Sequence, residues 1–232
     1  MGFWQVTMKR STRLSKSYII IGIFLTIYGV VLSNLMTIIP PDINNPAPID
    51  LTSNFPLLAI ALLSLSAVMF ALPVVMLFVY DKNNGVLEYL LSTGLDQLDI
   101  FKGYVKASLV LATYLLLFAI ILNTVVGILL GTSLTLLVSI ALLTFTIGIS
   151  EVFLVSVCMV AFSSLQKTPM GANQPLGIIV GIIPMFPALL LPIAFPTYAI
   201  IVDLTIAAIT LLASLALLLS TGRLIRREKL LP

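Results

Sequence analysis

The chain has no histidine, a single cysteine and little charge, with 9% of its residues charged. An ordinary soluble domain has roughly 25% charged residues. The absence of histidine excludes Ser-His catalysis, the two-histidine zinc site of a metalloprotease, and most other zinc and haem sites. The lone Cys158 allows neither an internal disulfide nor a thiol-based metal site, and its apolar neighbours favour a packing role. We therefore expect no metal site in this chain.

Apolar sequence, in contrast, is abundant, because 60% of the residues are hydrophobic. A helix rising about 1.5 Å per residue needs about 20 apolar residues to cross about 30 Å of hydrocarbon. Six stretches meet this requirement, so we predict an all-α polytopic membrane protein that forms a single transmembrane domain over residues 1–232. The six predicted transmembrane helices cover residues 18–39, 55–80, 107–130, 134–162, 176–194 and 198–219.

The twelve lysines and arginines predict the orientation of these spans. Basic side chains close to the ends of spans are retained on the cytoplasmic side of a membrane. With six spans, all twelve fall on one side: before the first, between the second and third, between the fourth and fifth, and after the sixth. We expect a multi-pass protein of the cell membrane with both termini cytoplasmic. Its basic residues would then face membrane lipid or a partner protein, and we expect no nucleic-acid partner.

Two short regions differ from the spans in composition. Residues 1–17 combine Phe3 and Trp4 with four basic residues, which is typical of a segment that lies at the membrane interface. Residues 183–197 are rich in proline, which removes backbone hydrogen bonds and kinks a helix. We expect a bent or broken helix there, with Pro184 and Pro187 as candidates for an outer gate, or simple packing kinks.

Residues 81–104, between the second and third predicted spans, form the one sizeable soluble segment. They begin with the turn sequence Asn83-Asn84-Gly85. Apolar residues then recur at helical spacing, which predicts two short amphipathic helices at the cytoplasmic face of the membrane. The two apolar sets are Leu87, Leu90 and Leu91, followed by Leu95, Leu98 and Phe101. Helices of this kind can dock in a groove of a partner through their apolar side chains.

This segment resembles the cytoplasmic loop of type-2 ABC transporter permeases. That loop has a charged residue, then Gly-x-Leu-Glu-x-Leu-Leu-Ser-x-Pro, then a second short helix leading to Gly-Lys. The matching residues here are Asp81, Gly85, Leu87, Glu88, Leu90, Leu91 and Ser92. Gly94 stands where the family often has proline, and Lys102-Gly103 reverses the Gly-Lys order. In sequence the likeness covers this loop; in predicted topology it covers the whole chain.

The resemblance implies the permease subunit of an ATP-driven ABC transporter of the exporter type, with its translocation path at the seam of a dimer. Two identical chains are favoured over two different ones. The loop would be the coupling element. The residues implied to contact the ATPase are Leu87, Glu88, Leu90, Leu91, Ser92, Gly94 and Leu95.

The chain itself lacks the Gly-x-x-x-x-Gly-Lys-[Ser/Thr] loop that cradles ATP phosphates. We therefore expect a transport subunit that is not an enzyme and holds no cofactor. ATP and Mg would be bound by a separate cytoplasmic ABC ATPase subunit, present in two copies per complex.

Glu151 lies near the middle of the fourth predicted span. An acidic residue is costly in hydrocarbon and usually faces a partner or a watery cavity. It is a candidate for lining the translocation path or gating the dimer seam; the alternative is a protonated side chain hydrogen-bonded to a hydroxyl of a neighbouring helix. Asp203, near the outer end of the sixth predicted span, is close enough to the interface to be solvated.

Three other function classes are open at this point. An intramembrane enzyme requires converging nucleophiles, bases or metal ligands, which one buried glutamate does not supply. A secondary transporter normally has internal repeats with interrupted helices in both halves, whereas only the fifth predicted span is interrupted here. A non-transporting membrane scaffold would have no ATPase partner. Nothing in the spans indicates a substrate.

Overall fold

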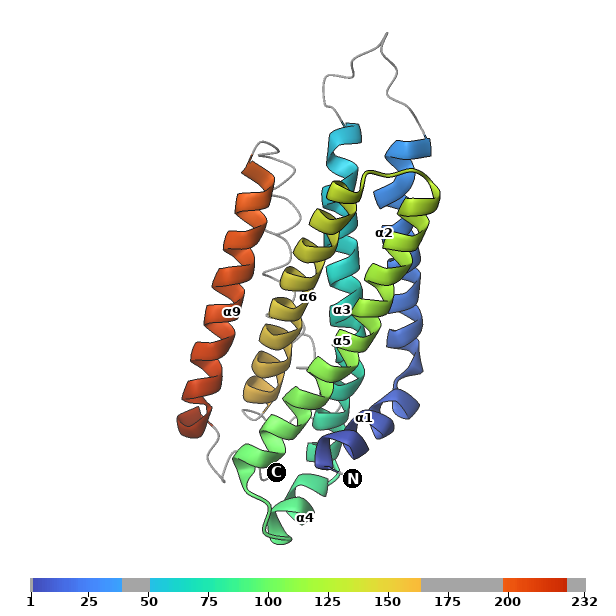
Figure 1. The fold of residues 1–232 in the computed structure, drawn as a ribbon. Coiled ribbons are helices and arrows are strands. Elements are labelled where there is room, and N and C mark those ends of the chain that lie inside the picture. Colours follow the sequence, from blue (N-terminus) through green and yellow to red (C-terminus); the bar gives the residue numbers. More distant parts are fainter. Residues whose placement is uncertain (1, 39–50, 164–197, 225–232) are drawn as a thin grey trace.

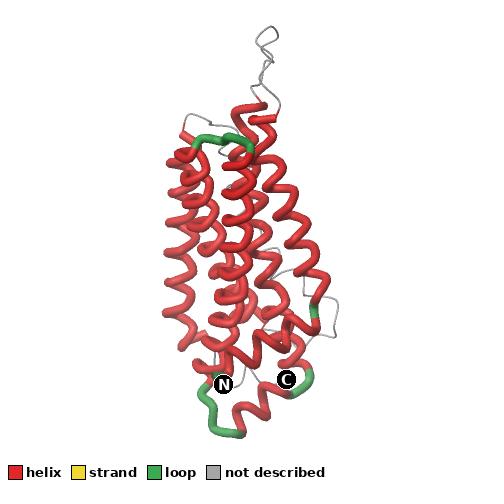
Figure 2. Tube along the Cα trace, turned by 45° about the vertical axis from the view of Figure 1, so that its right-hand side comes forward, coloured by secondary structure: helices red, strands yellow, loops and turns green. Residues whose placement is uncertain are grey.

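The computed structural model describes residues 2–38, 51–163 and 198–224, and its helices form an elongated bundle (Figures 1 and 2). The all-α prediction is confirmed for these ranges. In chain order the helices are α1 (Phe3–Leu14), α2 (Lys16–Ile38), α3 (Leu51–Asn83), α4 (Val86–Ser92), α5 (Gln97–Leu129), α6 (Leu134–Ser163) and α9 (Ala199–Leu224).

Four of these helices, α2, α3, α5 and α6, are long and apolar enough to cross a membrane. They coincide with the first four predicted spans, so the chain is a helical membrane protein. The sixth predicted span coincides with α9, whose apolar section Ile201–Ala216 is shorter. The fifth predicted span, residues 176–194, lies outside the described residues, together with Pro184, Pro187 and the proline-rich region 183–197. The count of six spans therefore stays a prediction.

The start of α5 differs from the predicted start of the third span at residue 107. Asp96 caps the helix, and its carboxylate accepts a hydrogen bond from the backbone N–H of Gln97 at 2.7 Å. Asp99 adds negative charge to the first turn, where it interacts favourably with the helix dipole. The prediction of a second separate short helix is therefore wrong, because Leu98 and Phe101 belong to the first turns of α5 and Leu95 precedes it.

Helix α3 lies at the centre of the bundle and packs against α2, α5 and α6, while α9 packs along α6. Buried alanines on α3 and α5 allow this close approach, as small residues do in membrane helix pairs. These alanines are Ala67, Ala71, Ala112 and Ala119. Helix α1 and the short α4 lie together at one end of the bundle, called here the α1–α4 end (Figure 1).

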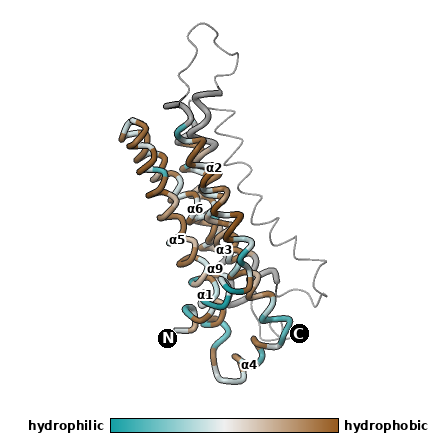
Figure 3. The backbone as a smooth tube through the Cα atoms, turned by 90° about the vertical axis from the view of Figure 1, so that its right-hand side faces the viewer, coloured by the Kyte–Doolittle hydropathy of each residue, from teal (hydrophilic) through white to brown (hydrophobic). Residues whose placement is uncertain are grey.

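Large apolar side chains cover the outside of the bundle. Phe24 on α2 is 67% exposed, Tyr114 on α5 is 67% exposed and Leu212 on α9 is 65% exposed. Apolar colour covers most of the long helices, and hydrophilic colour gathers toward the α1–α4 end (Figure 3). Such a surface is unfavourable in water but is well solvated by lipid tails.

Buried polar side chains connect α2 with α5 near the opposite end of the bundle. Asn34 donates from Nδ2 to Oδ1 of Asn123 at 3.2 Å, and Ser33 donates to the same oxygen. The Thr132 hydroxyl donates to Oδ1 of Asn34 at 3.3 Å. Hydrogen bonds between membrane helices contribute on average about 0.6 kcal/mol each, so this network stabilises the α2–α5 pairing modestly.

All eight basic residues of the described ranges are in helical segments close to the α1–α4 end. They occupy α1, the start of α2, the end of α3, the start of α5 and the last turn of α9 (Figure 1). The eight are Lys9, Arg10, Arg13, Lys16, Lys82, Lys102, Lys106 and Arg223. The basic side chains of the described ranges thus gather at one end of the bundle.

Candidate functional site

The turn before α4 is set by the backbone of Gly85. This residue has φ of 71°, in the left-handed region that a side chain disfavours, and it is the N-cap of α4. Its N–H donates to the carbonyl of Lys82 at 3.3 Å, closing the end of α3. The turn predicted from Asn83-Asn84-Gly85 is confirmed, although Asn83 still belongs to α3.

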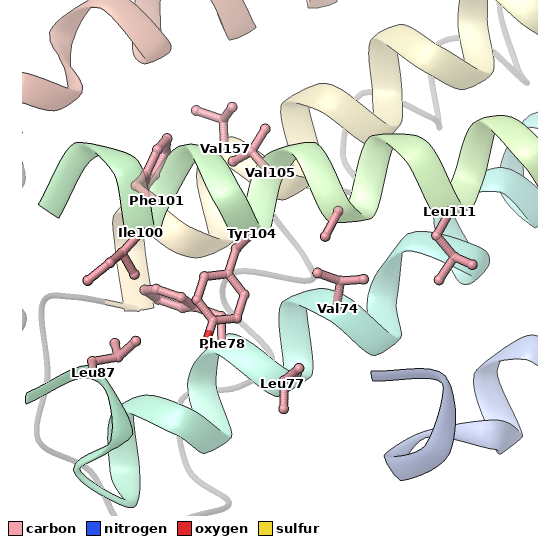
Figure 4. Packing of buried hydrophobic residues seen from close by; sticks show 11 residues of the cluster. Val74, Leu77, Phe78, Leu87, Ile100, Phe101, Tyr104, Val105, Leu111 and Val157 are labelled. Atoms are coloured by element: carbon pink, nitrogen blue, oxygen red, sulfur yellow. The ribbon is translucent and has the colours of Figure 1, made fainter. Parts of the chain in front are cut away.

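The inner face of α4 is seated in the chain's own core. Leu87 is 1% exposed and lies in one apolar cluster with Phe78 of α3 and with Ile100 and Tyr104 of α5 (Figure 4). Leu90 and Leu91 pack against the same cluster. Burying a leucine side chain stabilises by about 1.5–3 kcal/mol, so this cluster holds α4 in place. The predicted apolar stripe thus faces α3 and α5, and Leu87 is out of reach of a partner in this conformation.

The outer face of α4 and the turn after it are exposed. Tyr89 is 68% exposed and Leu95 is 38% exposed. Ser92 and Gly94 are also exposed, and Glu88 is half-buried. Tyr89 is absent from the predicted contact residues, yet the sequence contains the necessary information. It follows Leu87 by two positions, about 200° around a helix, which places it opposite the buried leucine.

Gly94 marks the place where the chain departs from the permease loop pattern. Its φ is 88°, and a Cβ there would meet nothing within 4 Å, so backbone conformation and not lack of space favours glycine. Proline fixes φ near −65° and cannot adopt this geometry. The turn that joins α4 to the Asp96 cap of α5 is therefore built differently from one with proline at this position.

Asp81, in the last turns of α3, joins three helices. Its side chain is 0% exposed and pairs with both terminal nitrogens of Arg10 on α1: Nη2 to Oδ1 at 2.8 Å and Nη1 to Oδ2 at 3.1 Å. The hydroxyl of Tyr104 on α5 donates to Oδ2 at 2.5 Å. Bidentate arginine pairs combine strength with fixed geometry. Asp81 therefore fixes the positions of α1 and α5 at the entrance to the loop.

Aromatic contacts hold α1 on the same cluster. The Phe3 ring meets the Tyr104 ring edge-on with centroids 5.5 Å apart, and the Nζ of Lys106 lies 5.2 Å from the Trp4 ring centroid. A Cβ on Gly103 would overlap the Phe3 ring, so glycine is needed for this approach. Residues 1–17, predicted as an interfacial segment, thus include a helix packed against the ends of α3 and α5.

Glu151 and Asp203 are both buried in the bundle, on α6 and α9. Glu151 is 1% exposed and Asp203 is 2% exposed. The expected solvation of Asp203 is therefore wrong, because its helix packs along α6. Both carboxyl oxygens of Glu151 and Oδ1 of Asp203 have no hydrogen-bond partner. A hydrogen bond from Glu151 to a neighbouring hydroxyl, the alternative interpretation above, is thus not formed.

The contacts at the α1–α4 end position the short helix α4 on the core of the bundle. Within the described ranges, no group of three or more His, Cys, Asp or Glu side chains that could hold a metal ion occurs. What the α1–α4 end offers is a firmly seated short helix with one exposed aromatic face.

No family model, no curated protein and no solved structure matches this chain. The likeness to ABC permeases therefore depends on the residues of the loop and on the predicted topology.

Proposed function

We propose that the chain is the membrane-spanning permease subunit of an ATP-driven transporter, and that α4 is the element that contacts a separate ATPase subunit. The observation that supports this best is that one face of α4 is buried against the bundle and the opposite face is exposed. Leu87 anchors its inner face to α3 and α5, while Tyr89 on its outer face and Leu95 in the turn after it are exposed.

Seated in this way, α4 would transmit movement to two long helices at once. Leu87 contacts the cluster that contains Phe78 of α3 and Ile100 of α5, and Asp81 bonds both Arg10 and Tyr104. A push on α4 would therefore displace the ends of α3 and α5 together as a packed unit. Conversion of partner motion into rigid-body helix displacement is an established route of conformational switching.

The rest of the proposal follows from the loop resemblance and the basic residues. The α1–α4 end would face the cytoplasm, where the ATPase subunits bind ATP and Mg. Two copies of the chain would form the translocation path at their seam. The exporter direction is likewise taken from the resemblance.

Affinity purification of the tagged chain from its native membrane in mild detergent tests this proposal. We expect a stoichiometric partner that carries a phosphate-binding loop, together with vanadate-sensitive ATP hydrolysis in the eluate. If no ATPase co-elutes from gently solubilised membranes, the proposal is overturned. The non-transporting scaffold and the secondary transporter would then be the better descriptions.

A further inference from the structure

Helix α1 has one face that the bundle leaves uncovered. Its inner face, with Phe3 and Met8, packs against the core cluster shared by α3 and α5. On the other side Val6, Lys9 and Arg13 are exposed. Residues three and four positions apart are neighbours on a helix surface, so these three side chains form one line along α1. This line, called here the outer face of α1, lies opposite the face that anchors the helix.

The outer face of α1 is positively charged and has no acidic residue near it in sequence. Residues 1–41 contain neither aspartate nor glutamate. Arg10 is neutralised by its ion pair with Asp81, whereas Lys9 and Arg13 form no ion pair within the part of the chain that the structure describes. The charges of these two side chains are therefore available to an external anion.

This face lies where the chain enters its first apolar helix. Helix α1 ends at Leu14, and Ser15 leaves the helical conformation with φ of −130° and ψ of 53°. The section of α2 that is apolar and long enough to cross a membrane begins at Lys16, which is exposed. One turn later Ile20 is 64% exposed, a surface suited to lipid tails. The basic side chains thus lie at the level where phospholipid headgroups begin.

The first turns of α5 extend the basic surface beside α1. The Nζ of Lys106 lies 5.2 Å from the ring centroid of Trp4, and Lys102, one turn earlier, is exposed as well. Tryptophan is enriched at the interface between a membrane and water. The exposed acids of this region, Asp96 and Asp99, lie at the very start of α5 rather than on α1.

We propose that the outer face of α1, together with Lys16, binds the headgroup phosphates of anionic phospholipids. Each basic side chain held near an anionic membrane strengthens association about fivefold. A lipid surface fits better than an acidic protein, because Val6 and Leu14 are 43% and 56% exposed beside the charges and can enter the boundary of the acyl chains. This inference goes beyond the proposed transport function and does not depend on an ATPase.

Quenching of Trp4 fluorescence by brominated lipid tests this proposal, because Trp4 is the one tryptophan of the chain and belongs to α1. The full-length chain is reconstituted in vesicles of phosphatidylcholine with phosphatidylglycerol as the minority lipid. Bromine is carried either by the phosphatidylglycerol or by an equal amount of the phosphatidylcholine. We expect the anionic lipid to quench at least about twice as strongly. High salt should remove this difference, since it screens the attraction between charges.

Two variants assign the preference to α1. Lys9→Gln, Arg13→Gln and Lys16→Gln together should abolish it, whereas Lys9→Arg, Arg13→Lys and Lys16→Arg together keep the charges and should retain it. All three positions are exposed, so both variants should unfold at the wild-type temperature.

Three results would overturn the proposal. The first is equal quenching by the two brominated lipids in the wild type, and the second is a preference that survives in the glutamine variant. The third is displacement of phosphatidylglycerol by inorganic phosphate at fixed ionic strength, which would assign the face to a soluble phosphate instead of a lipid. None of these results would bear on the contact between α4 and an ATPase.

Discussion

Replacement of Asp81 by leucine is expected to lower the unfolding temperature of the detergent-solubilised chain by roughly 5–10 °C, at about 2–4 °C per kcal/mol. The buried Tyr104 hydroxyl would lose its acceptor, which costs about 1–3 kcal/mol. Arg10 would lose its bidentate partner, but its side chain is 42% exposed and can be hydrated, so the loss is smaller than for a fully buried pair. The fluorescence of Trp4, the one tryptophan of the chain, reports the transition.

Two further variants separate the contributions to this effect. Asp81→Asn keeps an acceptor for Tyr104 and loses only the charge, so its unfolding temperature should lie between those of the wild type and Asp81→Leu. Addition of Arg10→Leu to Asp81→Leu should cost little more, because the partners act as one unit. Equal unfolding temperatures for wild type and Asp81→Leu would show that the contacts of Asp81 with Arg10 and Tyr104 do not hold α1, α3 and α5 together.

Tyr89→Ala is expected to weaken binding of the proposed ATPase partner by at least about 30-fold, equivalent to about 2 kcal/mol. Exposed tyrosines at the centre of an interface are among the residues whose truncation costs most affinity. Because Tyr89 is 68% exposed, its removal should leave the fold of the chain intact. The affinity is measured with the purified chain and the isolated ATPase by surface-immobilised binding in detergent.

Tyr114→Ala provides a matched control for this experiment. Tyr114 has the same side chain and nearly the same exposure, 67%, but lies within the apolar stretch of α5 that is long enough to cross a membrane. It should bind the ATPase as the wild type does. An equal loss of affinity in both variants would indicate a general disturbance, and no loss in Tyr89→Ala would remove α4 from the interface.

The membrane helices were predictable because length and apolarity alone determine them. Four of the six predicted spans correspond to α2, α3, α5 and α6, and the count of six stays a prediction. The start of α5 was missed, although Asp96 followed by Gln97 and Asp99 is a recognisable helix start. Hydropathy marks where a chain enters lipid, whereas a capping residue marks where a helix begins, and the two need not coincide.

The candidate site was predictable only in part. Periodicity identified Leu87, Leu90 and Leu91 as one apolar face, but it does not distinguish a partner's groove from the chain's own core. The pairing of Arg10 with Asp81 joins positions 71 residues apart, which requires the packing of α1 against α3. In the same way, Glu151 was recognisable as a costly intramembrane acid, but the burial of Asp203 depends on the packing of α9 along α6.

Site-specific photo-cross-linking from position 89 in native membranes tests the central claim most directly. A benzophenone side chain placed at Tyr89 should give a light-dependent adduct with a cytoplasmic protein that carries a phosphate-binding loop. The same group at Tyr114 should give adducts with lipid but none with that protein. Adducts that contain only lipid or only the chain itself at both positions would contradict the assignment of α4 as the contact with an ATPase.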